Sequence, residues 1–252
     1  MFKAALRYLQ GFRPRLKAVD MCGGAGKAAF VIKSCDPDCQ VTLVDCSDKM
    51  LDIARQKVRK QNIQGLEVVL DDAFSFLARD EKFDLIVFSS AVHHFKDPLA
   101  LLEAASKRLN DNGLIVTIAD PTTLTKTRRY KFFEFMLSDK ETKKTKVKSW
   151  FAFKNNGETA AGQDFDLAEY QTYTGIDDKK LAYELTKLGL HPMVHMRYPA
   201  GEPYLTKIMP WLGLCWAFSM IISPHQVNDH ALKVQGIKEQ LKREMPFRFQ
   251  FC

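Results

Sequence analysis

Three glycines, Gly23, Gly24 and Gly26, lie close together in the stretch "VDMCGGAGKAA" near the start of the chain. The residues before them read as an apolar strand, and those after them as the beginning of a helix. Backbone without side chains lets a ligand approach closely, and the free N–H groups of a helix start bind polar ligand atoms. The stretch therefore predicts a small-molecule cradle, although "GAGKAA" also fits the dinucleotide pattern G-x-G-x-x-[GA] and a purely structural tight turn.

Asp45 is the second residue suited to such a site. It closes the next apolar run, "VTLVD", about 20 residues after the glycines. An acid at this separation is typical of one that accepts hydrogen bonds from ribose hydroxyls. A carboxylate at a strand end is usually just a cap, but the two features together favour a cofactor that carries an adenosine.

The elements that must position these residues alternate along the first half of the chain. Strand-like runs and segments of helical period follow one another at residues 16–21, 26–35, 41–46, 47–62, 66–72, 83–90, 98–113 and 114–120. This alternation predicts βαβ units and a mostly parallel sheet in an α/β fold. Two helix starts are marked, because Ser47 offers a side-chain N-cap and Asp97-Pro98 places proline at a first helical position.

Five successive stretches carry a resemblance to a known family. They are "VDMCGGAGKAA", "VDCSDKMLDIAR", "VVLDDAFSF", "FDLIVFSSAVHHFKDP" and "LLEAASKRLNDNGLIVTIADP", and they run from Val19 to Pro121. In order and spacing the chain resembles class I S-adenosylmethionine-dependent methyltransferases, and among them the type 11 and ubiquinone/menaquinone-biosynthesis-like group. The resemblance implies a Rossmann-like, doubly wound, mostly parallel seven-stranded sheet with helices on both faces, and S-adenosylmethionine as the cofactor.

The resemblance also implies which residues bind the cofactor. Asp20, Cys22, Gly23, Gly24 and Gly26 would approach its methionine part; Asp45 would bind the ribose, with Cys46 beside it and Met50 on the adenine side; Asp72, followed by Ala73 and Phe74, would meet the adenine amino group; Ser89 and Ser90 would border cofactor and acceptor. The chain departs from the family at Cys22, where many members have glycine, and at Lys27, where an acid or a small residue is common. A side chain as small as that of Cys22 still fits, and we expect Lys27 to point away from the sulfonium.

His93 and His94 follow the fourth predicted strand and are the candidate catalytic residues. Methyl transfer from a sulfonium needs no nucleophilic residue, because the enzyme mainly holds acceptor and methyl group in place and excludes water. An oxygen or nitrogen acceptor that is protonated at neutral pH gains from a general base, and histidine suits that role. The alternative is that one histidine packs under the loop and the other is solvated, and a carbon acceptor activated by its own chemistry would need neither.

We predict a methyltransferase domain at residues 1–224, a lid-like insertion within it at about 121–174, and a helical, basic C-terminal tail at 225–252. The last strand is either "WAFSMIIS" (216–223) or "FRFQF" (247–251). The aromatic residues of the insertion and the late apolar run favour a small acceptor that is flat or lipophilic, such as a quinone precursor, a phenol or a lipid-like metabolite.

Two other functions fit parts of the chain. Tyr183 and Lys187 in "YELTK" have the Y-x-x-x-K spacing of NAD(P)-dependent short-chain dehydrogenases, but a solvated helix face is the favoured interpretation. The basic and aromatic residues of 126–154 fit an RNA-directed methyltransferase or RNA-binding protein, against which we favour a lid with its aromatic side chains turned inward. The sequence after the fourth strand lacks the Asn/Asp-Pro-Pro-Tyr pattern of base-nitrogen methylation, so a small-molecule acceptor is preferred to nucleic acid.

Composition limits the remaining choices. The net charge of +7 permits attraction to anionic partners. Six cysteines with no secretory segment predict reduced thiols and a cytoplasmic protein, and Cys35 and Cys39 lack the second pair expected of a zinc site, so no metal is predicted. The longest apolar run, Ile208–Ile222, is too short to cross a bilayer and contains Pro210 and Gly213, so we expect no transmembrane segment, and peripheral membrane contact stays open.

Overall fold

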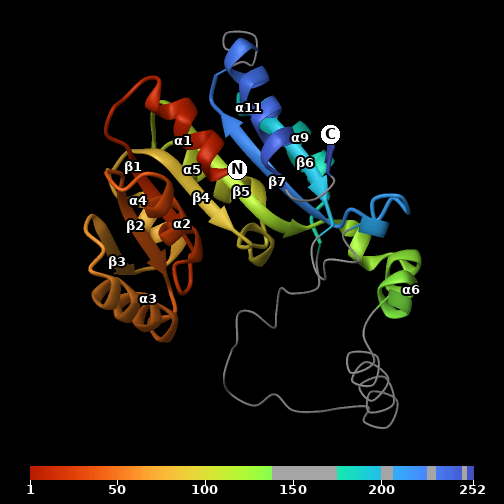
Figure 1. Cartoon of the computed structure of the whole chain (residues 1–252), viewed down its shortest axis with the longest axis horizontal. Coiled ribbons are helices and arrows are strands. Elements are labelled where there is room, and N and C mark those ends of the chain that lie inside the picture. The colour runs from red at the N-terminus through yellow and green to blue at the C-terminus, as the bar shows by residue number, and fades with distance from the viewer. Residues whose placement is uncertain (138–174, 200–206, 226–230, 246–248) are drawn as a thin grey trace.

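The computed structural model describes residues 1–137, 175–199, 207–225, 231–245 and 249–252. One mixed sheet runs through this part of the chain, and helices pack on both of its faces (Figure 1), which confirms the predicted α/β fold. Its strands are β1 (Lys17–Met21), β2 (Gln40–Asp45), β3 (Leu66–Leu70), β4 (Phe83–Ser89), β5 (Leu109–Pro121), β6 (His191–Tyr198), β7 (Ala217–Ser223) and β8 (Gln250–Phe251).

The strands lie in the order β3-β2-β1-β4-β5-β7-β6-β8. The first five pair in parallel, and β7 runs antiparallel between β5 and β6. Because the chain order reverses between β1 and β4, the carboxyl ends of these two strands define the place where an open α/β sheet binds its ligands.

Both candidates for the last strand belong to the sheet. β7 is buried along its whole length, whereas β8 is a two-residue strand that pairs with Met196 and Arg197 on the outer edge of β6. The described sheet thus has one short strand more than the seven expected, because the end of the chain returns to the otherwise unpaired edge of β6.

Each face of the sheet buries its own apolar cluster. On β4, Leu85 and Val87 face one cluster while Ile86 and Phe88 face the other, as the twofold period of a strand requires. A strand covered on both faces has no polar alternation, which explains the continuous apolar run that β4 shows in the sequence. One face is covered by α1 (Phe2–Gln10), α2 (Lys27–Cys35), α3 (Asp48–Gln61) and α11 (Ala231–Glu244), and the other by α4 (Ala73–Ala78), α5 (Pro98–Ser106) and α9 (Asp178–Lys187).

One of the two predicted helix caps forms as expected. The Asp97 carboxylate accepts a hydrogen bond of 3.0 Å from the N–H of Ala100, and Pro98 begins α5. The predicted side-chain cap of α3 is wrong: Ser47 stands at the N-cap, but its hydroxyl does not cap the helix. The N–H of Met50 in the first turn donates to the Ser47 carbonyl at 3.1 Å instead, and the N–H of Ser47 itself donates to the Asp45 carboxylate at 2.8 Å.

Helix α11 lies within the segment predicted as a C-terminal tail. Val234, Ile237 and Leu241 belong to the same buried cluster as the apolar side of α1, and Glu244 forms exposed ion pairs with Lys3 and Arg7. This helix therefore packs against the first helix of the domain.

Beyond β5 the chain leaves the sheet. The short helix η2 (Thr123–Lys126) and helix α6 (Arg128–Leu137) project from one end of the molecule (Figure 1) and enclose a small separate cluster with residues 208–216. The rest of the predicted insertion, residues 138–174, lies outside the described residues. Among the described helices, none combines the length and the apolar character needed to cross a membrane.

Candidate active site

The glycine loop follows β1 at the sheet edge where ligands are expected. Cys22, Gly24 and Gly26 all have left-handed backbone, with φ of 53°, 53° and 80°, and Gly26 closes a turn by donating to the carbonyl of Gly23 at 2.8 Å. Position 23 has no room for a side chain, because a Cβ on Gly23 would lie 2.4 Å from Leu43 Cδ1 and 2.5 Å from Asp20 Oδ2. The loop therefore depends on Gly23 for space, and Gly24 and Gly26 adopt the left-handed backbone that glycine reaches without strain.

Gly23→Ala is expected to lower the free energy of unfolding by about 2 kcal/mol or more, because the new methyl group must displace a buried leucine and a buried carboxylate. Gly236→Ala is the matched control, since a Cβ there meets nothing within 4 Å and the residue lies inside α11. That substitution should raise stability by about 0.5–1 kcal/mol. Urea unfolding measures the free energy of unfolding of both variants, and equal values for the two would contradict the packing of the loop.

Asp45 joins the loop to the end of β2. Its Oδ2 accepts a hydrogen bond from the N–H of Gly24 and its Oδ1 one from Ser47, both at 2.8 Å. Met50 lies over the same place, since its Cε would be 3.3 Å from a Cβ at Gly24. The structure therefore brings Gly24, Asp45 and Met50 together.

The cysteines beside this loop are neutral thiols. Burial, followed by the negative charge of Asp45, raises the pKa of Cys22 to about 12, and the same two causes raise the pKa of Cys46. A thiolate beside a methyl donor would itself be a nucleophile. Keeping these groups protonated leaves their sulfur atoms unreactive at neutral pH.

Asp72 begins α4 at the end of β3. Its carboxylate accepts hydrogen bonds of 3.0 Å from the N–H groups of Phe74 and Ser75, and bonds from Ser75 lower its pKa, so it is ionised at neutral pH. Phe74 and Met50 are both large apolar side chains that are more than a third exposed, at this same edge. Exposed apolar side chains beside ionised carboxylates are the surroundings that a purine ring and its ribose require.

Asp20 lies beneath the loop, with no exposed surface. Its Oδ2 accepts a hydrogen bond of 2.9 Å from Ala29 in α2, while Oδ1 is buried and has no partner among the described residues. Burial is the main cause that raises its pKa to about 7. In this conformation Asp20 holds the start of α2 against the end of β1.

Strained backbone marks the ends of three neighbouring strands. Besides Cys22 after β1, Ser90 after β4 and Ala119 near the end of β5 have left-handed φ values of 53° and 62°. The pairing of β5 with β7 shifts at this point, between Thr117 and Asp120. Such conformations cost of order 1–3 kcal/mol for a residue with a side chain, and they cluster at functional sites.

The irregularity in β5 places Asp120 against the histidines of the short helix η1 (Val92–His94). Asp120 is fully buried, and its Oδ1 lies 3.1 Å from the backbone nitrogen and 2.8 Å from Nδ1 of His93. Burial raises the pKa of Asp120, and the hydrogen bond from His93 opposes that rise. Asp120 is not among the residues predicted from the sequence, although its position at the end of the strand that follows β4 was a usable signal.

His94 lies beside this pair rather than in it. Its ring centroid is 4.0 Å from that of His93, and its buried Nδ1 has no partner among the described residues. Burial, followed by the neighbouring His93, lowers the pKa of His94, so it is neutral at pH 7. Of the two predicted histidines, His93 is thus the one held by a carboxylate.

A cavity of about 380 Å³ opens beside His93, between the starts of α5 and α9. Besides His93 and Gly175, it is lined by five apolar residues, Phe95, Pro98, Leu99, Ile176 and Leu181, and by five charged ones, Lys96, Asp97, Asp177, Lys180 and Glu184. None of the predicted cofactor residues lines it. The structure therefore shows two adjoining features, the loop edge with its carboxylates and a separate, partly apolar cavity that His93 borders.

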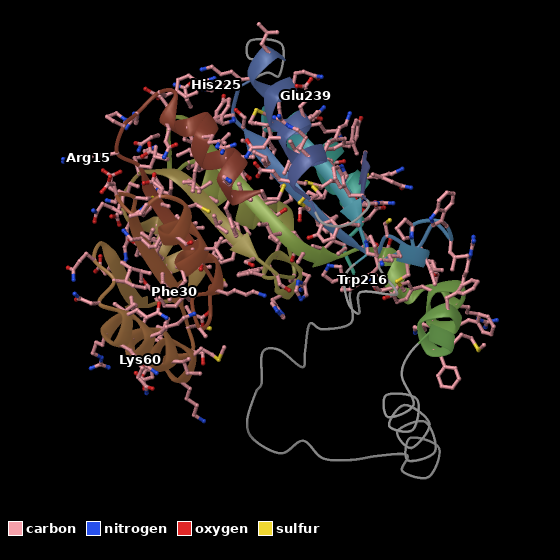
Figure 2. All side chains as sticks on the ribbon, viewed as in Figure 1. Arg15, Phe30, Lys60, Trp216, His225 and Glu239 are labelled. Atoms are coloured by element: carbon pink, nitrogen blue, oxygen red, sulfur yellow. The ribbon has the colours of Figure 1, made fainter. Side chains whose placement is uncertain are left out.

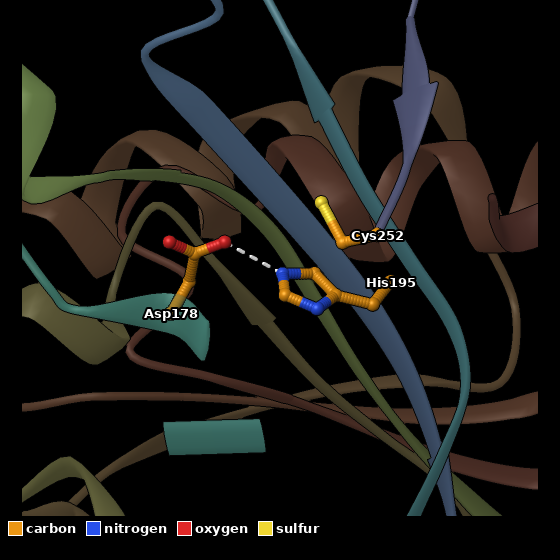
Figure 3. A group of neighbouring side chains, drawn as sticks. All are labelled: Asp178, His195 and Cys252. Carbon is orange, nitrogen blue, oxygen red and sulfur yellow. Dashed lines mark hydrogen bonds and ion pairs between the residues drawn. The ribbon is translucent and has the colours of Figure 1, made fainter. Parts of the chain in front are cut away.

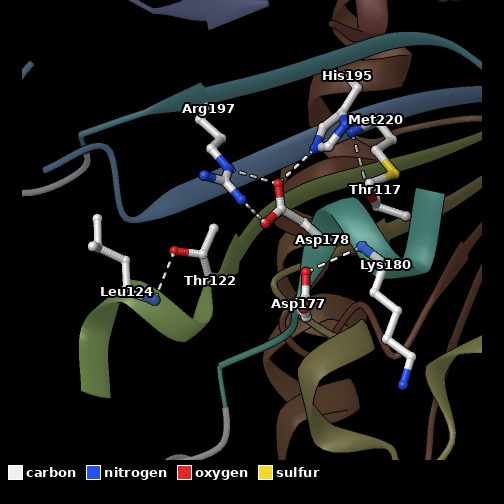
Figure 4. A network of polar contacts seen from close by, with 9 residues as sticks. All are labelled: Thr117, Thr122, Leu124, Asp177, Asp178, Lys180, His195, Arg197 and Met220. Atoms are coloured by element: carbon white, nitrogen blue, oxygen red, sulfur yellow. Dashed lines mark hydrogen bonds and ion pairs between the residues drawn. The ribbon is translucent and has the colours of Figure 1, made fainter. Parts of the chain in front are cut away.

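A second buried carboxylate, Asp178, holds α9 to β6. His195 Nε2 lies 2.6 Å from Asp178 Oδ2, and Arg197 donates to both oxygens at 2.8 and 2.5 Å (Figure 4). Cys252 lies close by (Figure 3), so that one donor atom from each of Asp178, His195 and Cys252 falls within 4.8 Å of the others. Because the guanidinium of Arg197 already occupies both carboxylate oxygens, a metal cation would have to compete with it, and we interpret the group as an ion pair.

Asp178→Ala is expected to destabilise the protein by about 3 kcal/mol at pH 7, because it leaves two donors without their acceptor. Burial alone would raise the pKa of Asp178, but the hydrogen bonds from His195 and Arg197 outweigh it and bring the pKa below its usual value. The ionised form therefore stabilises the fold at neutral pH, and this contribution disappears as the pH falls through the lowered pKa. In urea unfolding, the difference in free energy of unfolding between wild type and Asp178→Ala should be smaller in acid than at pH 7. The control is Glu184→Ala, which removes an exposed pair with Lys187 and should cost at most about 0.5 kcal/mol.

Tyr183 and Lys187 lie on the outer side of α9. Tyr183 is 61% exposed, and the Lys187 ammonium lies 4.4 Å from the centre of its ring. The ammonium also pairs with Glu184 at 3.0 Å. This arrangement is a solvated helix face, as favoured over the dehydrogenase interpretation.

The fold and the loop define the class of protein. The methyltransferase domain family matches residues 13–185, and the chain belongs to this family as a class I S-adenosylmethionine-dependent methyltransferase domain. Among curated proteins it is similar to demethylmenaquinone methyltransferase of Staphylococcus aureus strain JH9, with 26% identity over 131 residues that cover 50% of this chain and 54% of the relative. The chain thus spans about half the length of the curated relatives it matches.

Solved structures agree on the fold. The plantazolicin methyltransferase BpumL in complex with SAH superposes with a TM-score of 0.56 at 15% identity, covering 89% of this chain and 82% of that one. PKMT2 from Rickettsia typhi in complex with AdoHcy gives 0.56 at 16% identity, covering 89% and 53%. The mitomycin 7-O-methyltransferase MmcR gives 0.52 at 14% identity, covering 88% and 52%.

Proposed function

We propose that this protein transfers a methyl group from S-adenosylmethionine to a small acceptor of flat or lipophilic character. The cofactor supplies a methyl group that is already activated as a sulfonium. What the chain contributes is binding, orientation, exclusion of water and, for a protonated acceptor, removal of a proton.

The observation that carries the proposal is the position of Asp45. Its two oxygens each accept one hydrogen bond from the described part of the chain, from Gly24 and Ser47. A carboxylate offers about four acceptor positions, so each oxygen keeps one for a ribose hydroxyl. The backbone bonds fix the carboxylate at the end of β2, directly beside the glycine loop.

The remaining cofactor residues surround this carboxylate. Met50 and Phe74 offer apolar faces for the adenine ring, and the ionised Asp72 is an acceptor for its amino group. We assign the methionine part to the loop residues Asp20, Cys22, Gly23, Gly24 and Gly26, and the boundary with the acceptor to Ser89 and Ser90 at the end of β4. Cys46 adjoins the ribose position at Asp45, and Ala73 adjoins the adenine position at Asp72.

His93 is the group that we assign to proton removal. With the Asp120 carboxylate as the acceptor in its 2.8 Å contact with Nδ1, the proton lies on Nδ1 and Nε2 is left unprotonated. No part of the chain that the structure describes hydrogen bonds to Nε2, and His93 lines the cavity beside α5 and α9. An acceptor hydroxyl or amine in that cavity would lose its proton to Nε2. His94 supports the ring of His93 by packing against it.

The cavity also supports the chemical character of the acceptor. Its volume of about 380 Å³ suits a small molecule, and its five apolar lining residues offer an apolar surface beside five charged side chains. The name of the Staphylococcus aureus relative, a demethylmenaquinone methyltransferase, points in the same direction.

Two measurements test the proposal. Calorimetry should record binding of S-adenosylmethionine and S-adenosylhomocysteine and none of NAD(H); folded protein that binds neither nucleoside contradicts the cofactor assignment. Incubation with S-adenosylmethionine labelled on its methyl group should then transfer label to a compound in an organic extract of small metabolites. Label appearing only in RNA would instead support the nucleic-acid alternative.

A further inference from the structure

The cavity beside His93 has a buried part and an exposed part. Of its lining residues, His93, Ile176 and Leu181 are buried, whereas Lys96 and Lys180 are exposed. The buried part is apolar apart from the imidazole ring, and the exposed part carries charged side chains. A molecule that fills the cavity therefore meets a base and an apolar wall inside, and charged groups where it faces solvent.

The acids that line this cavity, Asp97, Asp177 and Glu184, already have partners within the chain. Asp97 and Asp177 are the N-caps of α5 and α9, where each carboxylate accepts a hydrogen bond from a backbone N–H of the first turn, at 3.0 and 3.1 Å. The partial positive charge of a helix start offsets such a carboxylate further. Glu184 pairs with the ammonium of Lys187 at 3.0 Å. The negative charges of the lining are thus compensated by contacts that the protein itself makes.

The two lysines of the lining lack such compensation. Within the ranges that the structure describes, the ammonium groups of Lys96 and Lys180 have neither a hydrogen bond nor an ion pair. Figure 4 shows the side chain of Lys180 directed away from the ion pair between Asp178 and Arg197. In a mostly apolar ligand site, a few polar groups fix the orientation of the ligand and select its charge. Two cations without a counter-charge at one cavity therefore favour an anionic ligand.

We propose that the methyl acceptor carries an anionic group, a carboxylate or a phosphate, which Lys96 and Lys180 bind. This inference rests on the proposed function, because it takes the cavity as the acceptor site. The anionic group lies in the exposed part, and the reacting hydroxyl or amine lies in the buried part against His93. In the reaction the methyl group passes from the sulfonium to the acceptor oxygen or nitrogen, the proton of that atom goes to His93, and S-adenosylhomocysteine is left. The anionic group only orients the acceptor, so the substrate class is a small, flat or lipophilic acid.

Three aromatic probes of one shape and different charge test the proposal. They are 6-hydroxy-2-naphthoate, its neutral amide and its cationic amidine, and in each the hydroxyl lies at the opposite end from the variable group. Binding to the full chain is followed by ligand-observed NMR, with and without S-adenosylhomocysteine. The naphthoate should bind about tenfold more tightly than the amide, the amidine should bind most weakly, and added salt should reduce the difference.

Variants assign the preference to the two lysines. Lys96→Gln combined with Lys180→Gln should lower the affinity for the naphthoate about tenfold and leave that for the amide unchanged. Lys60→Gln combined with Lys179→Gln is the matched control, because it removes the same charge elsewhere. Lys60 lies at the end of α3, which covers the opposite face of the sheet (Figure 2), and Lys179 lies on α9 but does not line the cavity. The control should keep the full preference for the anionic probe.

Three results would overturn the proposal: probes that bind alike or not at all, a preference for the amide or the amidine, and an anionic preference that the Lys96/Lys180 variant retains. The compound that gains the labelled methyl group should likewise be held by an anion-exchange resin at neutral pH, and a labelled product that passes through contradicts the inference. Calorimetry with S-adenosylhomocysteine separates the two proposals. Intact cofactor binding without a preference for the anion refutes this inference alone, whereas folded protein that binds no cofactor refutes the proposed function.

Discussion

Asp45→Ala is expected to weaken the binding of S-adenosylmethionine and of S-adenosylhomocysteine about 100-fold. The substitution removes the two acceptor positions that we assign to the ribose hydroxyls. Hydrogen bonds to a charged group contribute about 1.5 kcal/mol or more each, and a loss of about 3 kcal/mol corresponds to two orders of magnitude in affinity. The variant also releases the N–H groups of Gly24 and Ser47, which loosens the loop and acts in the same direction. Calorimetric titration with either nucleoside measures the effect.

Two further variants separate contact with the ribose from general damage. Asp45→Asn keeps one acceptor oxygen and should bind about tenfold more weakly than wild type. Asp48→Ala lies three residues away on the exposed start of α3, where its carboxylate pairs with Arg55, and should bind as wild type does. If folded Asp45→Ala binds both nucleosides with unchanged affinity, the cofactor does not lie at the end of β2 and the proposed function loses its main support.

The parallel half of the fold could be predicted because its signals are local. The buried strand β4 reads as an unbroken apolar run, Asp97-Pro98 marks the start of α5, and the glycines mark the turn after β1. The parallel pairing of β1 with β2 brings Gly24 and Asp45 together. Their spacing in the sequence was therefore enough to predict that they lie close in space. This is why the glycine loop and Asp45 could be predicted to share one site.

The features that escaped prediction depend on contacts between distant parts of the chain. Residues 247–251 were one of two alternatives for the last strand; that both alternatives pair in one sheet could not be predicted, because it depends on the open edge of β6. The hydroxyl of Ser47 does not cap α3, and the N–H of Met50 in its first turn donates to the Ser47 carbonyl instead. Asp120 meets His93 because β5 shifts its pairing with β7, a strand about a hundred residues further on. A sequence shows where a histidine can act as a base. The acid that orients its ring is identified only from the way the strands pair in the fold.

His93→Gln is expected to lower the rate of methyl transfer to an oxygen or nitrogen acceptor by a factor of about 100 or more, with little change in the affinity for S-adenosylmethionine. General-base catalysis contributes typically 10²–10⁴-fold, and glutamine cannot accept the proton. Asp120→Asn should lower the rate about tenfold, because an amide can no longer hold the Nδ1 proton as a charged acceptor and the ring loses its fixed orientation. The rates are measured with the labelled methyl donor and the compound that gains the label.

The decisive readout is chemical rescue, which a purely structural role would not produce. In His93→Ala, added imidazole should enter the cavity that His93 borders and restore part of the rate, without changing cofactor affinity or thermal stability. His94→Gln is the control, since His94 packs beside His93 without a carboxylate partner, and its rate should stay within about threefold of wild type. A fully active His93→Gln variant would show that the acceptor reacts without a base, as expected for an acceptor carbon activated by its own chemistry, and the His93–Asp120 pair would then serve only to hold η1 against β5.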